Sequence, residues 1–140
     1  MYLAPRGTID ILPEDQPYWA YLYHHIAEVT ALFGYQRLDI PIFEETELYA
    51  RGVGQGTDIV DKEMYSFQDK GGRDITLRPE FTAGVVRAYL QHGMKTRPQP
   101  VKLYTTGPLF RYERVQAGRY RQHTQFDIEC IGELDPAVDL

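Results

Sequence analysis

LFRYERVQAGRYRQHTQFDIECI, residues 109–131, is the stretch that decides the fold. Polar and apolar side chains alternate at both of its ends, which predicts two β-strands, at 109–114 and 122–131, around a loop. Because successive side chains of a strand point to opposite faces, each strand has an apolar and a polar side. The apolar sides carry Phe110 and Tyr112, and Phe126, Ile128 and Cys130. The polar sides carry Arg111 and Glu113, and Gln125, Asp127 and Glu129. Paired, the strands form a sheet with a polar face and an apolar face, and Cys130 is assigned to the core.

The polar face has two interpretations. One is a solvated face, which is common in antiparallel sheets. The other is a binding site, because an arginine fork fits a phosphate or carboxylate, and carboxylates beside an amide fit an ammonium or imidazole group.

The charge distribution also points to this stretch. Residues 111–121 contain four arginines and one acid, a charge of +3, and the remaining residues carry −8 because the whole chain carries −5. A chain with this overall charge does not bind nucleic acid by bulk electrostatics. The concentrated arginines indicate one site for an anionic ligand, and a solvated surface loop is the alternative.

The N-terminal quarter predicts a helix followed by a strand. Apolar residues spaced by four, four, three and four positions define one helix face: Tyr18, Leu22, Ile26, Val29 and Phe33. Gly34 ends the helix, and residues 35–42 form a strand with Leu38, Ile40 and Ile42 on one side. Pro41 places that strand at a sheet edge or marks its end. The aromatic residues at 18, 19, 21 and 23 are interpreted as packing or interface residues.

The middle of the chain predicts a hairpin and a second helix. Strands at 64–67 and 74–77 flank the turn at 69–72. A helix at 82–92 directs Val85, Val86, Tyr89 and Leu90 inward and stops at Gly93, and a further strand covers 101–106. The expected fold is α+β, a mostly antiparallel sheet flanked by helices in one domain, 1–140. The glycine-rich segment 51–57 is expected to be a mobile loop and lacks the ending of a phosphate-binding P-loop.

Composition limits the class of protein further. No apolar run is long enough to span a bilayer and the first residues do not resemble a signal peptide, so a soluble, cytoplasmic protein is expected. The single cysteine excludes an internal disulfide. The four histidines have no metal-ligand spacing, and no protein-held metal is expected.

Two segments resemble signatures of class II aminoacyl-tRNA synthetases. GYQRLDIPIF (34–43) resembles the first signature, whose proline lies at the dimer interface, and FRYE (110–113) resembles the second, whose arginine holds the ATP α-phosphate. Five ordered blocks are more specifically similar to histidyl-tRNA synthetases: APRGTID (4–10), TDIVDKEMY (57–65), LRPE (77–80), TAGVVRA (82–88) and GRYRQ (118–122). The resemblance covers nearly the whole chain and implies an incomplete class II catalytic core.

This resemblance implies a ligase that activates histidine with ATP to histidyl-adenylate and transfers it to tRNA(His), acting as a homodimer, with Mg²⁺ accompanying ATP. Arg111 is the implied catalytic residue. The implied histidine contacts are Glu80, Phe81, Thr82, Arg111, Gln125 and Glu129. Those implied for ATP are Arg111, Glu113, Arg119 and His123. Arg114 and Gln116 fall in the loop that approaches the tRNA acceptor end.

The sequence departs from the family pattern in places. Phe81 stands where glycine is usual, Val115 replaces a proline, the pair at 123–124 differs, and Asp127 stands where a small or apolar residue is common. The resemblance stops at Leu140, before the third signature and the anticodon-binding domain, so the 140 residues alone are expected to have little or no activity.

Two alternatives stay open. One is a synthetase-like paralogue that senses histidine as a regulatory subunit of ATP phosphoribosyltransferase. Its members usually lose the tRNA-facing loop, whereas GRYRQ (118–122) is intact here. The other is a stand-alone nucleic-acid-binding module, which only the arginine cluster supports.

Overall fold

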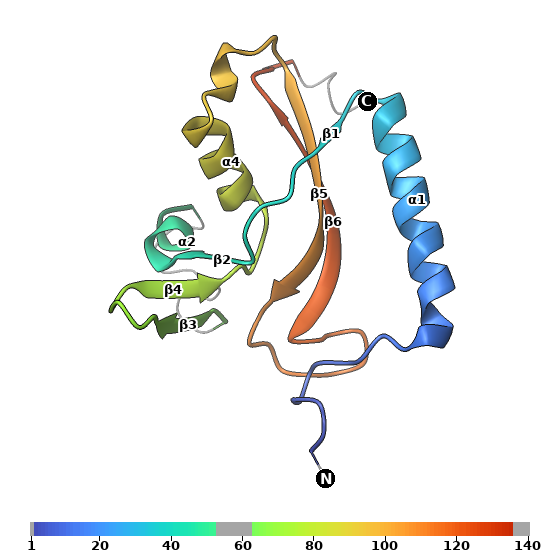
Figure 1. Ribbon diagram of the computed structural model, residues 1–140. Helices are drawn as coiled ribbons and strands as arrows, with labels where there is room; N and C mark the ends of the chain where they lie inside the picture. Colours follow the sequence, from blue (N-terminus) through green and yellow to red (C-terminus); the bar gives the residue numbers. More distant parts are fainter. Residues whose placement is uncertain (1, 53–62, 136–140) are drawn as a thin grey trace.

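The computed structural model describes residues 2–52 and 63–135 (Figure 1). Two long strands, β5 (Val101–Phe110) and β6 (Gln122–Ile131), run through the middle of the molecule. Helix α1 (Gln16–Leu32) lies on one side of them, and α4 (Thr82–Gln91), α2 (Thr46–Gly52) and a small sheet lie on the other. Every strand pair except one is antiparallel among the described residues. The predicted α+β class is confirmed.

The central hairpin differs from its prediction. β5 and β6 pair along their full length, from Val101 opposite Ile131 to Phe110 opposite Gln122. β5 is therefore one strand where two were predicted, and it ends at Phe110, so Arg111 to Arg114 lie in the connection. The sequence at Gly107 and Pro108 resembles a break between strands. Pro108 is tolerated because β1 pairs only with Leu103 and Tyr104, so no neighbouring strand needs an N–H at position 108.

The strand predicted at 35–42 is also shorter than expected. β1 comprises only Gln36–Arg37 and pairs in parallel with β5. Beyond it the carbonyls of Ile40 and Pro41 accept hydrogen bonds from Nη1 of Arg78, at 2.8 and 3.3 Å. A buried side chain from another segment thus takes the place of a neighbouring strand, and Pro41 has no N–H to extend the ladder.

The second sheet has the order β2-β4-β3. The predicted hairpin is confirmed as β3 (Tyr65–Gln68) and β4 (Asp74–Leu77), and Asp69 stabilises its turn by accepting the backbone N–H groups of Gly71 and Arg73. β2 (Phe43–Glu45) and α2 were not predicted, because both are short and neither has a clear apolar pattern. Of the predicted loop at 51–57, positions 51 and 52 end α2, and positions 53–57 lie outside the described residues.

Helix α1 begins and ends as predicted, and Gly34 follows it with a φ of +76°, the left-handed conformation expected of a glycine after a helix. Its apolar face, however, is mostly open to solvent: Tyr18 is 72% exposed and Leu22 is 52% exposed. Thr30 is the buried residue of this helix. None of the helices within residues 2–52 and 63–135 combines the length and apolarity that a membrane span requires.

The buried face of helix α4 is rotated about the helix axis relative to the predicted one. Gly84, Val85, Ala88 and Tyr89 are buried, whereas Val86 and Leu90, predicted to point inward, are exposed. The rotation brings the helix against Ile40, since a Cβ added to Gly84 would lie 2.5 Å from Ile40 Cδ1. The core cluster joins α4 to β5 through residues that include Phe81, Val85, Leu103 and Leu109.

The central hairpin has a polar side and an apolar side on β6, as predicted. The prediction that the apolar side of β6 faces the core was wrong. Opposite residues in an antiparallel pair share a face, and the buried Leu103, Thr105 and Leu109 lie opposite Glu129, Asp127 and His123. The polar side of β6 therefore faces the core and α4. On the other side Ile128 is 50% exposed and Cys130 is only partly buried. The alternation is real, but α4 covers the face that contains the carboxylates.

Candidate functional site

The polar row of β6 lies half-buried beside the start of α4. His123, Gln125, Asp127 and Glu129 are all partly buried on the core side of the strand. Burial raises the pKa of Asp127 to about 6, and the negative charges of Glu129 and Glu80 contribute to this rise. Glu80, from the loop before α4, is thus close enough to act on the β6 row. The structure brings three predicted histidine contacts, Glu80, Gln125 and Glu129, to one region.

Arg111 lies immediately after β5, at the end of the sheet where β6 begins. Its Nε donates a hydrogen bond of 2.8 Å to the carbonyl of Pro79, the residue before Glu80. Its Nη1 lies 4.0 Å from a carboxylate oxygen of Glu113. Although β5 has ended, burial still alternates at 111–114, so Arg111 and Glu113 are partly buried and their neighbours Tyr112 and Arg114 exposed. The predicted direction of Arg111 is therefore preserved outside the strand.

Glu113 joins two of the arginines. Its carboxylate is largely buried, and one oxygen lies 3.3 Å from Nε of Arg119. His123 lies near both Arg111 and Glu113. Burial lowers the pKa of His123, and the positive charge of Arg111 lowers it further. A neutral imidazole at pH 7 can accept or donate a hydrogen bond without adding charge to the site.

Glu80 has a second role at the start of α4. Its carboxylate accepts the backbone N–H of Ala83 at 3.1 and 3.3 Å, which satisfies one of the unpaired donors of the first helical turn. Beside it is a cleft of about 710 Å³ between α2 and α4, whose lining includes Glu80, Thr82 and Arg111. An ionised carboxylate and a guanidinium at one cleft can bind the ammonium and carboxylate groups of an amino acid.

Phe81 lies deeper than the other predicted histidine contacts. Its side chain is 1% exposed and belongs to the core cluster between α4 and β5. It does not line the cleft that contains its neighbours Glu80 and Thr82. Phe81 therefore lies in the core next to the cleft, and its contact with histidine stays a prediction.

The arginine-rich loop divides into different roles. Arg114 and Gln116 are exposed, and Gln116 exchanges backbone hydrogen bonds with Arg119 at the turn. Arg121 stacks over the ring of Tyr112 at 3.8 Å, and its backbone N–H donates to the carbonyl of Gly7. Arg111 and Arg119 lie near the carboxylate of Glu113, and Nε of Arg121 donates to the Glu113 main-chain carbonyl at 3.4 Å.

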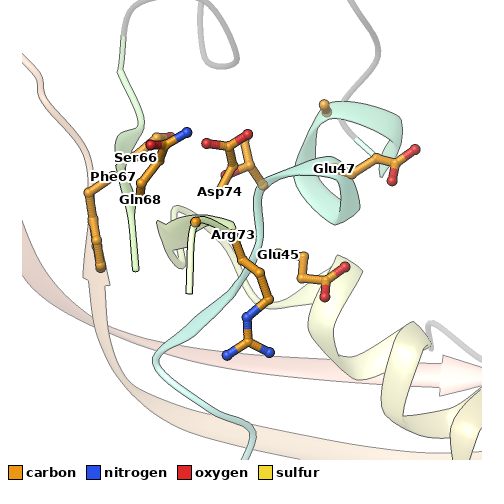
Figure 2. Close-up of a pocket in the computed structure, with 10 residues that line it drawn as sticks. Glu45, Glu47, Ser66, Phe67, Gln68, Arg73 and Asp74 are labelled. Atoms are coloured by element: carbon orange, nitrogen blue, oxygen red, sulfur yellow. The ribbon is translucent and has the colours of Figure 1, made fainter. Parts of the chain in front are cut away.

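A second cleft, of about 730 Å³, lies between α2 and the β3–β4 hairpin (Figure 2). It combines acidic residues such as Glu45, Glu47 and Asp74 with Arg73, whose guanidinium is already paired to Asp69 at 2.8 Å. It contains none of the predicted site residues. Across the part of the chain that the structure describes, no group of three His, Cys, Asp or Glu side chains could hold a metal ion.

The sequence of the chain matches a known family. The family model for histidyl-tRNA synthetase matches residues 7–140. The chain belongs to the histidyl-tRNA synthetase family. It is 62% identical over 139 residues to the histidine–tRNA ligase of Dehalococcoides mccartyi, covering 99% of this chain and 33% of that protein.

Solved structures agree with this membership. The apo histidyl-tRNA synthetase of Staphylococcus aureus superposes with a TM-score of 0.83 at 47% identity, over 99% of this chain and 31% of the other. A Bacillus halodurans protein described as an ATP phosphoribosyltransferase regulatory subunit/histidyl-tRNA synthetase has a TM-score of 0.81 at 26% identity, over 99% of this chain and 35% of the other. The chain spans about a third of the length of the curated histidyl-tRNA synthetases it matches.

Sequence reasoning left Arg78 without a role. It lies within the LRPE block that carries part of the histidyl-tRNA synthetase resemblance. It is 4% exposed, and its side chain donates hydrogen bonds to carbonyls of two segments of the chain, at Ile40 and Pro41 and at Pro108. In the sequence Arg78 is only an arginine between a predicted strand and a proline. Its hydrogen-bond partners become known only from the folded structure.

Proposed function

We propose that this chain forms the N-terminal part of the catalytic core of a cytoplasmic histidine–tRNA ligase. One observation supports the proposal: in a chain 62% identical to a histidine–tRNA ligase, Gln125 and Glu129 lie on the core side of β6, the charge of Glu80 acts on Asp127 between them, and Arg111 bonds the carbonyl of the residue before Glu80. The site is polar and half-buried, so its charges are less screened than in open water.

The substrate histidine is bound through its charges. Glu80 accepts hydrogen bonds from the α-ammonium group of histidine, and Glu129 accepts one from an N–H of its imidazole ring. Gln125 hydrogen-bonds the substrate's polar main-chain groups. Thr82 lies beside Glu80 in the cleft and adds a hydroxyl. Two carboxylates and one arginine in the site suit an amino acid whose side chain donates hydrogen bonds.

The reaction has two steps. A carboxylate oxygen of histidine attacks the α-phosphorus of ATP, bound as its magnesium complex, and the bond to the β-phosphate oxygen breaks to release pyrophosphate. A ribose hydroxyl of the terminal adenosine of tRNA(His) then attacks the acyl carbon, and AMP leaves. Arg111 neutralises the carboxylate and α-phosphate as they approach, which is a charge-stabilising role.

The other residues serve the nucleotide and the tRNA. Glu113, Arg119 and His123 line the nucleotide side, and Glu113 orients the two arginines that it contacts. Arg114 and Gln116, exposed at the turn, approach the acceptor end. The active form is a homodimer, in which α1 and the segment 34–43 contribute to the interface.

Arg111→Ala tests the proposal. The activity requires more chain than these 140 residues, so the protein used is a chimera in which they replace the matching segment of the Dehalococcoides mccartyi ligase. Loss of one charge-stabilising donor lowers rates by about 10² to 10³. We expect histidine-dependent ATP–pyrophosphate exchange to fall by about that factor in Arg111→Ala and by less in Arg111→Lys, which keeps the charge but loses the planar fork.

The control is Arg97→Ala, which removes an exposed arginine outside the site and leaves exchange unchanged. Near-normal exchange in a folded Arg111→Ala chimera rejects this face as the active site. Tight binding of histidine to the isolated chain without nucleotide would favour the regulatory paralogue, to which the Bacillus halodurans likeness at 26% identity gives limited support.

A further inference from the structure

Arg78 is a buried arginine whose guanidinium bonds to the main chain. Its Nε donates to the carbonyl of Pro108 at 2.9 Å, and its Nη1 donates to the carbonyl of Ile40 at 2.8 Å. The first acceptor lies on β5 and the second on the segment that leads from β1 to β2. One side chain thus connects the two sheets at the point where they meet.

The backbone of the same residue makes two more connections. The N–H of Arg78 donates to the carbonyl of Ile42 at 2.9 Å, and its carbonyl accepts the N–H of Phe110 at 3.0 Å. The following carbonyl, of Pro79, accepts Nε of Arg111 at 2.8 Å. Arg78 is therefore hydrogen-bonded to Phe110, the last residue of β5, and Pro79 to Arg111, the residue after it. The second of these hydrogen bonds holds the Arg111 guanidinium.

The Arg78 guanidinium is also enclosed on its flanks. Its Cζ lies 4.8 Å from the centre of the buried Phe81 ring. A Cβ added to Gly107 would lie 2.7 Å from Nη2 of Arg78, so the group packs against the β5 backbone. A guanidinium held by carbonyls from two segments and enclosed by a ring and a backbone has little freedom to shift.

We propose that Arg78 is a positioning residue for Arg111: it fixes the Pro79 carbonyl, and that carbonyl fixes the plane of the Arg111 guanidinium. The inference rests on the proposed function, in which Arg111 acts on the reacting groups. Lysine cannot replace Arg78, because a single ammonium on a flexible stem does not present a planar fork to the Pro108 and Ile40 carbonyls together.

The first experiment measures kinetic coupling in the chimera. A misplacement of about 1 Å at a reacting group can lower a rate by about 10². We expect Arg78→Lys to lower kcat for ATP–pyrophosphate exchange by about 10-fold to 10²-fold with little change in KM for histidine. Because Arg78 acts through Arg111, the double variant Arg78→Lys/Arg111→Ala should be no slower than Arg111→Ala alone. Arg97→Lys is the matched control and leaves kcat unchanged.

Two results overturn the inference: a kcat for Arg78→Lys within about twofold of the parent, or losses that multiply in the double variant. A role only in folding would lower thermal stability without that coupling. If Arg78→Lys fails to fold, Gly107→Ala replaces it: the added methyl displaces the guanidinium, which keeps all its donors, and it also strains the β5 backbone at a φ of +157°, so its double variant with Arg111→Ala is measured beside it. Gly107→Ala is expected to lower kcat and to show the same lack of additivity with Arg111→Ala.

The second experiment needs no activity. In the chimera with ¹⁵N-labelled arginine, the Nε–H signal of Arg111, identified by its loss in Arg111→Lys, should exchange more slowly with solvent than that of the exposed Arg97. Exchange as fast as Arg97 in the parent overturns the inference. In the Arg78→Lys chimera this Nε–H exchange should become faster, approaching that of Arg97, and an unchanged rate would overturn the role of Arg78. A parent chimera without histidine-dependent ATP–pyrophosphate exchange would instead reject the proposed function, and the comparison of the two Nε–H rates would still decide the role of Arg78.

Discussion

Asp127 shows how one residue changes the chemistry of the site. It lies between Gln125 and Glu129 on the core side of β6. Gln125 hydrogen-bonds its carboxylate, while its Oδ2 is buried and has no hydrogen-bond partner within the described residues. Burial and the charges of Glu129 and Glu80 raise its pKa to about 6. Ionisation of Asp127 therefore costs more in the folded chain than in the unfolded chain.

Asp127→Asn should remove a pH dependence of stability. The folded pKa is raised above the unfolded value of 3.8, so the stabilisation is complete below about pH 4 and is lost as the pH rises through about 6. Full linkage for this shift is about 3 kcal/mol, and solvent screening at a half-buried group reduces our expectation to about 1 kcal/mol. The free energy of unfolding, from urea titrations, should favour Asp127→Asn over the parent by about 1 kcal/mol more at pH 7 than at pH 4. A difference independent of pH would show that Asp127 is not destabilised by ionisation.

At the residue scale, the sequence predicted which side chains share a face but not which face is covered. Alternation put Gln125, Asp127 and Glu129 on one side of a strand, and the register confirms this. Burial depends on α4, which packs on the carboxylate side through contacts far apart in the sequence. Phe81 shows the same limit, because a motif position gives no information about whether its side chain points into the core.

At the element scale, the packing of α4 depends on a glycine inside the helix. Glycine is normally unfavourable there by about 1 kcal/mol relative to alanine. Gly84 is buried, and a Cβ at this position would lie 2.5 Å from Cδ1 of Ile40. The close approach of α4 to Ile40 therefore outweighs the helix propensity.

Gly84→Ala should destabilise the chain even though it adds a better helix former. Overpacking costs about 1 to 3 kcal/mol, against a propensity gain of about 1 kcal/mol, so we expect a net loss of about 1 kcal/mol in urea unfolding. In an Ile40→Val background the Cδ1 methyl is absent, and the same substitution should become neutral or stabilising. If Gly84→Ala stabilises the chain that retains Ile40, the Ile40 side chain moves aside at no cost and the packing argument is wrong.

Elements with a strong local pattern were predicted, and those decided by distant contacts were not. The bounds of α1 and β6 follow from long periodic runs. β5 continues through Gly107 and Pro108 because the Arg78 side chain and backbone support that end of the strand from outside the sheet. β1 stops early for the same reason, since Arg78 engages the carbonyls of Ile40 and Pro41. No local pattern in the sequence could reveal that one buried arginine sets both ends.

At the scale of the whole molecule, two apolar surfaces are open. One is the outer face of α1, where Tyr18, Leu22, Val29 and Phe33 are each more than half exposed. The other is the side of β6 away from α4, with Phe126 and Ile128. Contiguous apolar surface on an isolated chain favours association with another surface. The matched relatives are about three times longer, so additional chain can also cover part of these surfaces.

The isolated 140-residue chain should therefore associate with itself, and α1 should be the element responsible. Segment 34–43, which follows α1, resembles the class II signature that is expected at a dimer interface, and a second copy of α1 would bury the exposed side chains of both helices. We expect sedimentation velocity to show a concentration-dependent dimer for the parent. Leu22→Glu places a charge in the centre of the apolar face and should shift the chain to monomer, whereas Ala20→Glu, on the opposite side of the same helix, should leave association unchanged.

A parent that stays monomeric at high concentration contradicts self-association. Equal association of the Leu22→Glu and parent chains would exclude the α1 face as its cause and leave the exposed side of β6 as the alternative.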